Sequence, residues 1–308
     1  MNYEHIFDEL EISTDPFALC QLKGACHMGL PGDSSATLHY ILSGDGQVSL
    51  PGRPPLAVSS GSMVLIPAMK SHSLHSFGTL SDPVPVCQPA AVNLSHHLAG
   101  EDDQHAITGQ LIALCSHLTV GLRGASDIIS LIRQPLVEHV TESSPIKPLM
   151  SALLQEISNP GIGSRAMMRT ILTQCMIELL RKRLVARDET LAWMAALRDS
   201  SIWNALRAML DTPGDNHTVE SLADSVGMSR SAFAKRFSET YGSGPMELLR
   251  DLRMRLAGSL LRETELPVKR IAEIVGFSSR SAFSRTFEAK TGQGPKAFRA
   301  GESSSTDP

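Results

Sequence analysis

Two stretches near the carboxyl end of the chain repeat one pattern of apolar and polar positions. They cover residues 219–245 and 268–295. Each begins with apolar residues at positions i, i+3, i+4 and i+7, which form the buried stripe of a short helix. A glycine, Gly227 or Gly276, follows this stripe and ends the helix as a left-handed cap residue does. The pattern therefore predicts the same helix and the same stop in both stretches.

A second helix is predicted after the glycine in each stretch. Serines able to N-cap it stand at Ser229 in the first copy and at Ser278 or Ser279 in the second. Each second helix carries two phenylalanines one turn apart and ends in G-x-G-P, where proline stops the helix. The phenylalanines are Phe233, Phe237, Phe283 and Phe287. Helix, glycine turn, helix is typical of a helix-turn-helix unit, and two matched copies favour DNA binding over a helical hairpin repeat that packs on protein.

The outward face of each second helix follows from helical geometry. At about 100° per residue, the direction opposite the phenylalanines falls on Lys235 in the first copy and on Arg285 in the second. Arg230 and Arg280 stand near the helix starts, from which recognition helices reach base edges. Arginine suits bidentate contact with guanine. For any single cation, the alternative interpretation is a phosphate contact or a solvated side chain.

Between the two copies, a further apolar stripe predicts a connecting helix over about residues 246–262. Its leucines are Leu249, Leu252, Leu256 and Leu260. A helix of this length spans roughly 26 Å, and successive major-groove faces lie roughly 34 Å apart. One such rod could hold both second helices on one side of a duplex. Arginines on or beside it are candidates for phosphate contacts or for pairing with Glu247 or Asp251; they are Arg250, Arg253 and Arg255.

The amino-terminal half has a different pattern. Residues 17–118 read as short strands separated by glycine and proline turns, which indicates a sandwich or barrel. Two apolar runs around Gly44-Asp45-Gly46 predict a hairpin there. The segment 61–67 predicts a short buried strand that ends at Pro67.

Helices are predicted after these strands. Residues 146–157 carry a stripe of 3.6-residue period, and residues 167–184 are apolar around much of the circumference. A helix that is apolar on two sides needs two partners. We expect the barrel to be one of them, and the other to be a second subunit in a homodimer or, as the alternative, another part of the same chain.

Composition and charge agree with a division into two domains. The chain has 308 residues, enough for two cores, and a net charge of −4. Residues 1–200 carry 13 Lys and Arg against 19 Asp and Glu, whereas residues 201–300 carry 15 against 11. Ten of the eleven histidines precede residue 200. An acidic, histidine-bearing part joined to a basic part is typical of a sensing domain linked to a nucleic-acid-binding domain.

Several classes of protein do not match the sequence. No apolar run approaches the roughly 20 residues that span a bilayer, and the acidic start is unlike a signal peptide. The five cysteines are scattered and include no C-x-x-C pair, which argues against a disulfide framework or a zinc ribbon. The sequence thus predicts a soluble cytoplasmic protein without membrane contact.

The residues of the carboxyl-terminal repeats resemble those of the AraC/XylS family of bacterial transcription regulators. The resemblance covers residues 201–300 and rests on both repeats, on the run Ile271-Ala272-x-x-Val275-Gly276-Phe277, and on Phe283-x-x-x-Phe287. It implies sequence-specific promoter binding, usually with transcription activation and RNA polymerase as a partner. The base-contact positions of the family fall on Ser231, Ala234, Lys235, Arg280, Ser281, Ser284 and Arg285. Ala234 departs from the long polar side chains often found at its position.

The strand-rich part resembles the cupin sensor domain of one branch of that family. Gly61, Pro67 and His72 match the second cupin motif, in which Met69 replaces the usual glycine. The first motif is incomplete, because His39 stands alone. His39 and His72 are expected to be hydrogen-bonded structural histidines beside the mouth of the pocket. The alternative is a site for a small-molecule effector of unknown identity, or for a metal, at His39, His72 and His75. His96, His97 and His105 read as solvated loop residues.

The sequence as a whole predicts an α+β protein with two domains. Residues 1–190 are expected to form a cupin-like sensor and dimerisation domain, with a β-barrel or sandwich at about 15–118 and trailing helices at about 126–187. Residues 200–300 are expected to form an all-α DNA-binding domain with two helix-turn-helix units, and residues 301–308 a disordered tail. Walker A, G-x-S-x-G and H-E-x-x-H motifs are absent from the sequence, so we expect no enzyme, cofactor or bound metal. The alternative is a metal-dependent cupin enzyme with a DNA-binding appendage.

Overall fold

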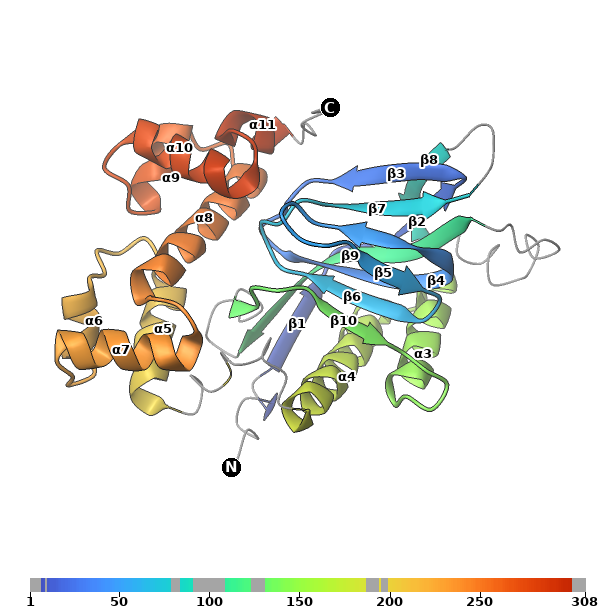
Figure 1. Ribbon diagram of the computed structural model, residues 1–308, viewed down its shortest axis with the longest axis horizontal. Coiled ribbons are helices and arrows are strands. Elements are labelled where there is room, and N and C mark those ends of the chain that lie inside the picture. Colours follow the sequence, from blue (N-terminus) through green and yellow to red (C-terminus); the bar gives the residue numbers. More distant parts are fainter. Residues whose placement is uncertain are drawn as a thin grey trace.

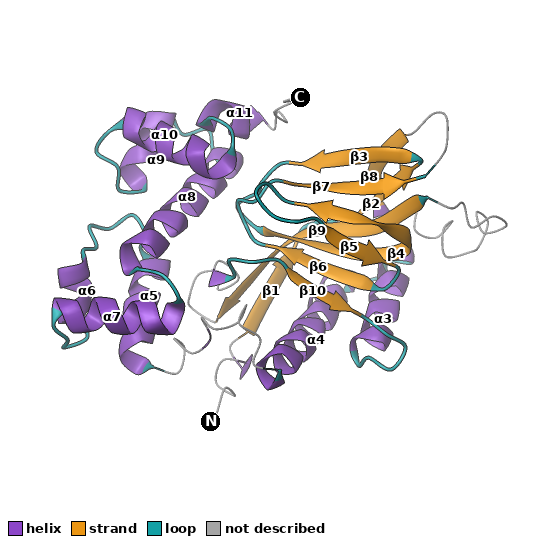
Figure 2. Ribbon diagram, in the orientation of Figure 1, coloured by secondary structure: helices purple, strands orange, loops and turns teal. Residues whose placement is uncertain are grey.

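A computed structural model gives the fold of residues 7–8, 10–78, 84–90, 109–122, 131–186, 194 and 199–300. A strand-rich domain and a helical domain lie side by side, with two helices packed against the strands (Figure 1). Figure 2 shows that strands occupy the amino-terminal part of the chain and helices the carboxyl-terminal part. The prediction of an α+β protein with a barrel followed by paired helix-turn-helix units is confirmed.

In the described residues of the first domain, ten antiparallel strands form a nearly closed barrel. They are β1 (Leu10–Thr14), β2 (Ala18–Lys23), β3 (Ala25–Leu30), β4 (Ala36–Ser49), β5 (Leu56–Ser59), β6 (Ser62–Ile66), β7 (His72–Phe77), β8 (Val84–Pro89), β9 (Gln110–Leu122) and β10 (Leu136–His139). Six of them follow the order β10-β6-β4-β9-β2-β8. Of the other four, β1 pairs with β9, β5 and β7 pair with β4, and β3 pairs with β7. The predicted strand over 61–67 is β6, which is buried along its whole length.

The hairpin predicted at Gly44-Asp45-Gly46 is wrong. β4 runs through these residues as one strand that has a register irregularity against β9 between Ile41 and Ser43. A Cβ atom at Gly44 would lie 1.6 Å from the carbonyl oxygen of Gln110, and the φ of Gly44 is +82°. The glycine therefore serves a close approach of β9 and a bend in β4, and not a turn between two strands.

Helices α3 (Ile146–Ser158) and α4 (Ser164–Val185) cover one side of the barrel (Figure 1). The apolar residues of α4 on both of its sides are buried within this chain: Ile171, Leu172, Cys175, Met176, Leu179 and Leu180. They belong to one core with residues of the sheet and of α3, such as Leu38 and Leu153. The two partners of α4 are thus the barrel and α3. The alternative of burial within one chain holds for this stripe, and the homodimer stays an untested prediction.

The second domain consists of seven helices among the described residues. They are α5 (Ser200–Asp211), α6 (Val219–Ser225), α7 (Arg230–Tyr241), α8 (Pro245–Glu263), α9 (Val268–Ile274), α10 (Arg280–Thr291) and α11 (Pro295–Ala300). α6 and α7 form the first helix-turn-helix unit, α9 and α10 form the second, and α8 joins them. Its 19 residues span about 28 Å.

The sequence signals of the repeats act as predicted. Gly227 and Gly276 have φ values of +68° and +77° at the turns. Ser229 and Ser279 accept hydrogen bonds from the backbone N–H three residues ahead, so Ser279 and not Ser278 caps α10. The four phenylalanines of the repeats are completely buried, and within each helix their ring centroids lie 5.6 Å apart. Each lobe therefore has its own aromatic core.

Some predictions fall on residues outside the described part of the chain. These are the loop histidines His96, His97 and His105 and the tail 301–308. Among the helices of the described residues, none combines the length and the apolar character needed to cross a bilayer.

Candidate DNA interface and the buried histidine pair

The first recognition helix, α7, presents a cation on its outer face. Lys235 is 77% exposed, on the side of α7 opposite the buried phenylalanines, and its nearest acidic neighbour is Glu239 at 3.9 Å. Arg230 and Ser231 are also exposed, at the start of the helix, whereas Ala234 is half-buried. An exposed pair at 3.9 Å contributes little energy, so Lys235 is free to contact another molecule.

The second recognition helix, α10, has the same arrangement. Arg280, Ser281 and Arg285 are exposed, and Ser284 is half-buried. Among the described residues, the side chains of these two arginines make no hydrogen bond or ion pair with the protein. All eight predicted DNA-contact residues therefore lie on the two recognition helices, six of them exposed and two half-buried.

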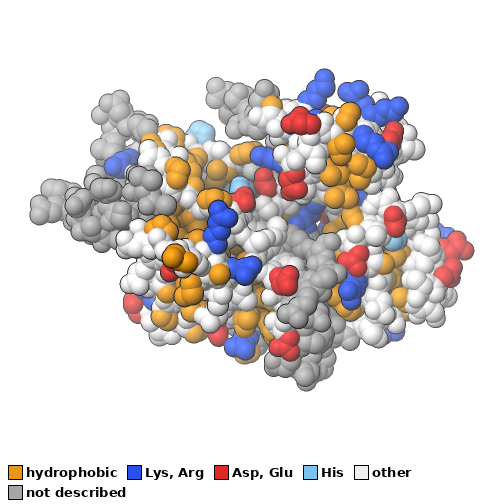
Figure 3. Space-filling model, turned by 180° about the vertical axis from the view of Figure 1, so that it is seen from behind, with side chains coloured by type: hydrophobic (Ala, Val, Ile, Leu, Met, Phe, Trp, Pro, Cys, Tyr) orange, Lys and Arg blue, Asp and Glu red, His pale blue; other side chains and the backbone are white. Residues whose placement is uncertain are grey.

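Basic side chains gather at the end of the molecule formed by α9, α10 and α11 (Figure 3). The exposed cations on these three helices are Lys269, Arg270, Arg280, Arg285 and Lys296. Of them, Arg270 pairs with Glu273 at 3.0 Å. Such a concentration of positive charge attracts the phosphates of DNA.

Two of the arginines on α8 bind backbone carbonyls of the protein, whereas the sequence indicated contacts with phosphates or with acidic residues of α8. Arg253 donates hydrogen bonds to the backbone carbonyls of Pro213 and Asp215, at 2.9 and 2.8 Å, and to that of Gly276 at 3.5 Å. Burial lowers the pKa of its guanidinium below the usual value. Arg255 donates to the carbonyl of Ser34 in the barrel domain. Both guanidiniums are thus bonded to backbone carbonyls of the chain itself, and their phosphate contacts stay an untested prediction.

The acidic residues of α8 also have other partners than predicted. Glu247 pairs with Arg133 of the barrel domain at 2.5 Å, and Asp251 pairs with Lys290 of α10 at 2.7 Å. The first pair joins the two domains, and the second fixes α10 on α8. Arg250 is exposed and remains a phosphate-contact candidate on this helix.

In the barrel, His39 of β4 and His72 of β7 form a buried pair. Their Nε2 atoms lie 2.7 Å apart, and both rings are almost inaccessible to solvent. Burial lowers the pKa of His72 to about 4 and that of His39 well below its ordinary value, so both are neutral at pH 7. Each neutral ring carries a single N–H proton, so its hydrogen-bond partners decide which of its two nitrogens donates and which accepts.

The direction of the hydrogen bonds follows from the one partner that can only accept. The carbonyl of Lys70 lies 3.2 Å from His72 Nδ1, so this nitrogen carries the proton and His72 Nε2 accepts. His39 Nε2 therefore donates to His72, which leaves His39 Nδ1 as an acceptor. Its partner is the thiol of Cys115 at 2.9 Å. The result is a directed chain from a thiol through two imidazoles to a backbone carbonyl.

His75 lies apart from this pair. It follows His72 by three residues on β7, and its ring stacks on His27 and shares a 2.7 Å hydrogen bond with Ser73. The structure thus joins two of the three predicted effector residues and separates the third. Nowhere in the described ranges do three His, Cys, Asp or Glu side chains converge as metal ligands. The Nε2 atoms of His39 and His72 are hydrogen-bonded to each other, and a cupin metal centre needs at least three protein ligands.

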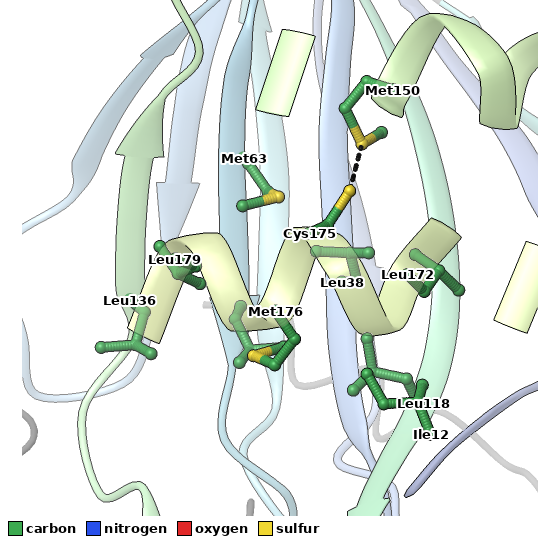
Figure 4. A pocket seen from close by; sticks show the side chains of 11 residues that line it. Ile12, Leu38, Met63, Leu118, Leu136, Met150, Leu172, Cys175, Met176 and Leu179 are labelled. Carbon is green, nitrogen blue, oxygen red and sulfur yellow. Dashed lines mark hydrogen bonds between the residues drawn. The ribbon is translucent and has the colours of Figure 1, made fainter. Parts of the chain in front are cut away.

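Several hollow regions adjoin the barrel, and two of them bear on ligand binding. An apolar cavity of about 20 Å³ lies between the sheet and α4, lined by Leu38, Met63 and Met176 among others (Figure 4). It has room for little more than one water molecule. A larger cleft of about 760 Å³ lies between the two domains, and its lining combines apolar side chains with polar and charged ones such as Asp33, His117 and Arg262. Its volume falls within the usual range of ligand sites.

Met69 ties the barrel to the DNA-binding domain. It is 1% exposed and belongs to the core of the second helix-turn-helix lobe, with Met254, Phe283 and Phe287. Its φ of +62° makes it the one described non-glycine residue with positive φ. On α8, a Cβ atom at Gly258 would lie 3.2 Å from the Met69 sulfur, so glycine makes room for this side chain. Met69 thus stands where the cupin motif usually has glycine. We call its side chain, which is inserted into the core of the neighbouring domain, the interdomain plug.

Comparisons with known proteins agree with this description. A cupin family model matches residues 4–184, and a helix-turn-helix domain model matches residues 222–301. The HTH-type transcriptional regulator AlkR of Acinetobacter baylyi is 27% identical over 96% of this chain and 97% of its own. A putative AraC-like transcription regulator of Streptomyces antibioticus is 31% identical over 65% of each chain.

Among solved structures, ToxT of Vibrio cholerae aligns over 94% of this chain and 98% of its own, with a TM-score of 0.52 and 15% identity. At that identity the likeness concerns the fold. The predicted resemblance is confirmed by the two family models, which together cover most of the chain. This chain belongs to the AraC-like family of helix-turn-helix transcription regulators, in the group whose amino-terminal domain is a cupin.

Proposed function

We propose that this regulator binds two consecutive major-groove faces of promoter DNA through α7 and α10 and activates transcription in response to an effector. The observation that carries the proposal is the repeated placement of a cation on the solvent face of each recognition helix, Lys235 and Arg285. Arg230, Ser231, Arg280 and Ser281 flank these cations at the helix starts. Recognition helices read base edges with residues in these positions.

The partners beyond DNA belong to the same proposal. Activation requires contact with RNA polymerase, and the place of action is the cytoplasm, where bacterial promoters lie. Small-molecule binding by the barrel domain, with His39, His72 and His75 as the predicted residues, stays a prediction, as does a homodimer. Light scattering at micromolar concentration measures the dimer directly. The relatives named above are transcription regulators, so the proposal is a regulator and not an enzyme.

The test begins with fragments of genomic DNA that the purified full chain retains. One retained fragment then serves as the probe in gel-shift titrations of Lys235→Ala, Arg285→Ala and the control Arg181→Ala. Arg181 is an exposed cation on α4 of the barrel domain, so its loss changes net charge equally at a remote place. We expect each recognition-helix variant to lose about 1–3 kcal/mol of binding free energy and the control to lose none.

The salt dependence separates the two kinds of contact. Loss of a phosphate contact lowers the slope of log K against log salt by about one, whereas loss of a base contact changes the preference at one base pair. Unchanged binding in both recognition-helix variants at matched salt would remove α7 and α10 from the interface.

A further inference from the structure

A pair of cysteines lies at one edge of the sheet that forms the barrel. Cys87 is exposed on β8, the last strand in the order β10-β6-β4-β9-β2-β8, and Cys20 lies buried and directly opposite on β2. Their sulfur atoms are 2.6 Å apart and both residues are free thiols. A disulfide bond is about 2.05 Å long, so a small shift of either side chain is sufficient to form one.

The pair continues into the interior of the barrel. Cys115 of β9 is the diagonal neighbour of Cys20, since Ala113 lies opposite Cys20 and Ala18 lies opposite Cys115. A hydrogen bond with Cys115 is the largest influence on the Cys20 thiol and raises its pKa. Cys115 is in turn the thiol bonded to His39, which begins the directed chain to His72 and the carbonyl of Lys70.

The chain of hydrogen bonds ends beside the contact between the two domains. Lys70 follows Met69, whose side chain is part of the core of the second helix-turn-helix lobe. One row of hydrogen-bonded groups thus runs from an exposed thiol on the barrel edge to the carbonyl of Lys70, and Lys70 is joined through the backbone to Met69. Packed and hydrogen-bonded rows of this kind are physical routes for coupling between distant sites.

We propose that Cys20 and Cys87 are an oxidation site of this regulator, and that their conversion to a disulfide alters DNA binding through the row that ends at Met69. The effect of oxidation on DNA binding rests on the proposed function, because it names the signal that regulates this binding. Formation of the disulfide rests only on the geometry of the two strands.

The chemistry requires a two-electron oxidant, for which a peroxide is sufficient. The exposed Cys87 sulfur attacks one peroxide oxygen, the O–O bond breaks, and one water leaves with the thiol proton, giving a sulfenic acid. The Cys20 sulfur then attacks the Cys87 sulfur, the S–O bond breaks, and a second water leaves with the Cys20 proton. Two thiols and one peroxide give one disulfide and two waters.

Oxidation removes the hydrogen-bond donor of Cys20. A thiol both donates and accepts a hydrogen bond, whereas a disulfide sulfur has no proton to donate. Cys115 therefore loses a donor on one side, while its own proton is shared with His39 on the other. The hydrogen bond between Cys115 and His39 is the first that the change reaches.

In the reduced protein both thiols are held protonated. The hydrogen bond with Cys20 and burial raise the pKa of Cys87 above its usual range, and the pKa of Cys20 is raised as well. Thiolates, and not thiols, attack peroxides. Cys87 must therefore lose its proton before its sulfur attacks the peroxide.

The first experiment maps the bond. The full chain is reduced, treated with excess hydrogen peroxide, alkylated, digested and analysed by mass spectrometry. We expect a peptide crosslink between Cys20 and Cys87, absent in Cys87→Ser and retained in the control Cys26→Ser. Cys26 lies on β3, where its sulfur is 3.5 Å from the Ser76 hydroxyl. Sulfenic acid on Cys87 without this crosslink, or a crosslink of Cys20 to Cys115 instead, overturns the site.

The second experiment measures the coupling on a retained genomic fragment. We expect reduced and oxidised protein to differ about 5- to 150-fold in affinity, the usual range for coupled sites. The difference should be reversed by dithiothreitol, absent in Cys87→Ser and reduced in Met69→Gly. A mapped crosslink that leaves the affinity unchanged overturns the sensing role. Failure of the reduced protein to bind DNA contradicts the proposed function instead, and the peptide map still decides the thiol pair.

Discussion

At the scale of single residues, the His39–His72 pair makes stability depend on pH. The pKa of His72 is about 4 in the folded protein, and an unfolded histidine has a pKa of about 6.5. Between these values the unfolded chain binds more protons than the folded one. Stability is therefore fully present above about pH 6.5 and is lost as the pH falls towards 4, by a few kcal/mol.

Urea unfolding at pH 7 and pH 5 checks this prediction. We expect the native protein to be clearly less stable at pH 5, and a His72→Gln variant, which cannot titrate at this position, to lose less between the two pH values. His217→Asn serves as the control, because His217 lies outside the barrel and makes its bonds within its own loop. Equal pH dependence in the native protein and His72→Gln would contradict the assignment of neutral, buried rings.

Arg253 gives a second prediction at this scale. Its guanidinium holds the carbonyls of Pro213 and Asp215, which precede the first repeat, and that of Gly276 in the turn of the second. Arg253→Ala leaves these acceptors without a charged donor, which costs about 1.5–3 kcal/mol. Thermal unfolding should show this loss, whereas Arg250→Ala, a change of an exposed arginine on the same helix, should leave the melting temperature nearly unchanged.

The role of Arg253 marks a limit of sequence reasoning. Helical spacing places Arg250, Arg253 and Arg255 on or beside one rod, but it does not show which carbonyls from distant loops surround them. By contrast, Lys235 and Arg285 follow from the direction opposite the buried phenylalanines, which is a property of one helix alone. Residue positions fixed by local geometry could be predicted, and those fixed by loop packing could not.

At the scale of elements, the contact between Met69 and α8 decides how the two domains dock. Gly258→Leu puts a side chain where the Met69 sulfur lies, since even a Cβ atom there is 3.2 Å from it. We expect the plug to be expelled and the domains to separate, seen as a larger radius of gyration in small-angle X-ray scattering. Gly244→Ala is the control, because a Cβ there meets no atom within 4 Å. An unchanged radius in Gly258→Leu would show that the plug does not hold the domains.

Removal of the plug itself gives a separate prediction. Met69→Gly restores the residue that a φ of +62° favours and removes roughly 1–2 kcal/mol of backbone strain. The barrel should therefore keep its thermal stability while the interdomain contact weakens. Differential scanning calorimetry and scattering on the same sample separate the two effects. A large loss of barrel stability would mean that Met69 supports the barrel instead of the neighbouring domain.

The errors of the sequence analysis also belong to this scale. Gly44-Asp45-Gly46 looks like a hairpin because glycines mark turns, but here Gly44 lets β9 approach a single bent strand. The apolar circumference of α4 correctly required two partners, yet it did not show that α3 is one of them. Periodicity identifies which face of an element is buried; the partner depends on contacts between residues far apart in the sequence.

At the scale of the whole molecule, α8 sets the distance between the recognition helices. It spans about 28 Å, and one turn of duplex is about 34 Å. If both helices engage, the DNA must bend towards the protein to close the difference. The two helix-turn-helix repeats and the connecting helix α8 could both be predicted from the sequence, because each depends on local periodicity. The thiol row could not, since it joins five strands and a loop.

The most direct measurement of the central claim is a hydroxyl-radical footprint of the full chain on a genomic fragment that it retains. Two protected patches are expected on one face of the duplex, about one helical turn apart. Lys235→Ala should weaken one patch and Arg285→Ala the other, at a salt concentration where Arg181→Ala changes neither. A single patch, uniform protection along the fragment, or two patches insensitive to both variants would contradict binding through α7 and α10.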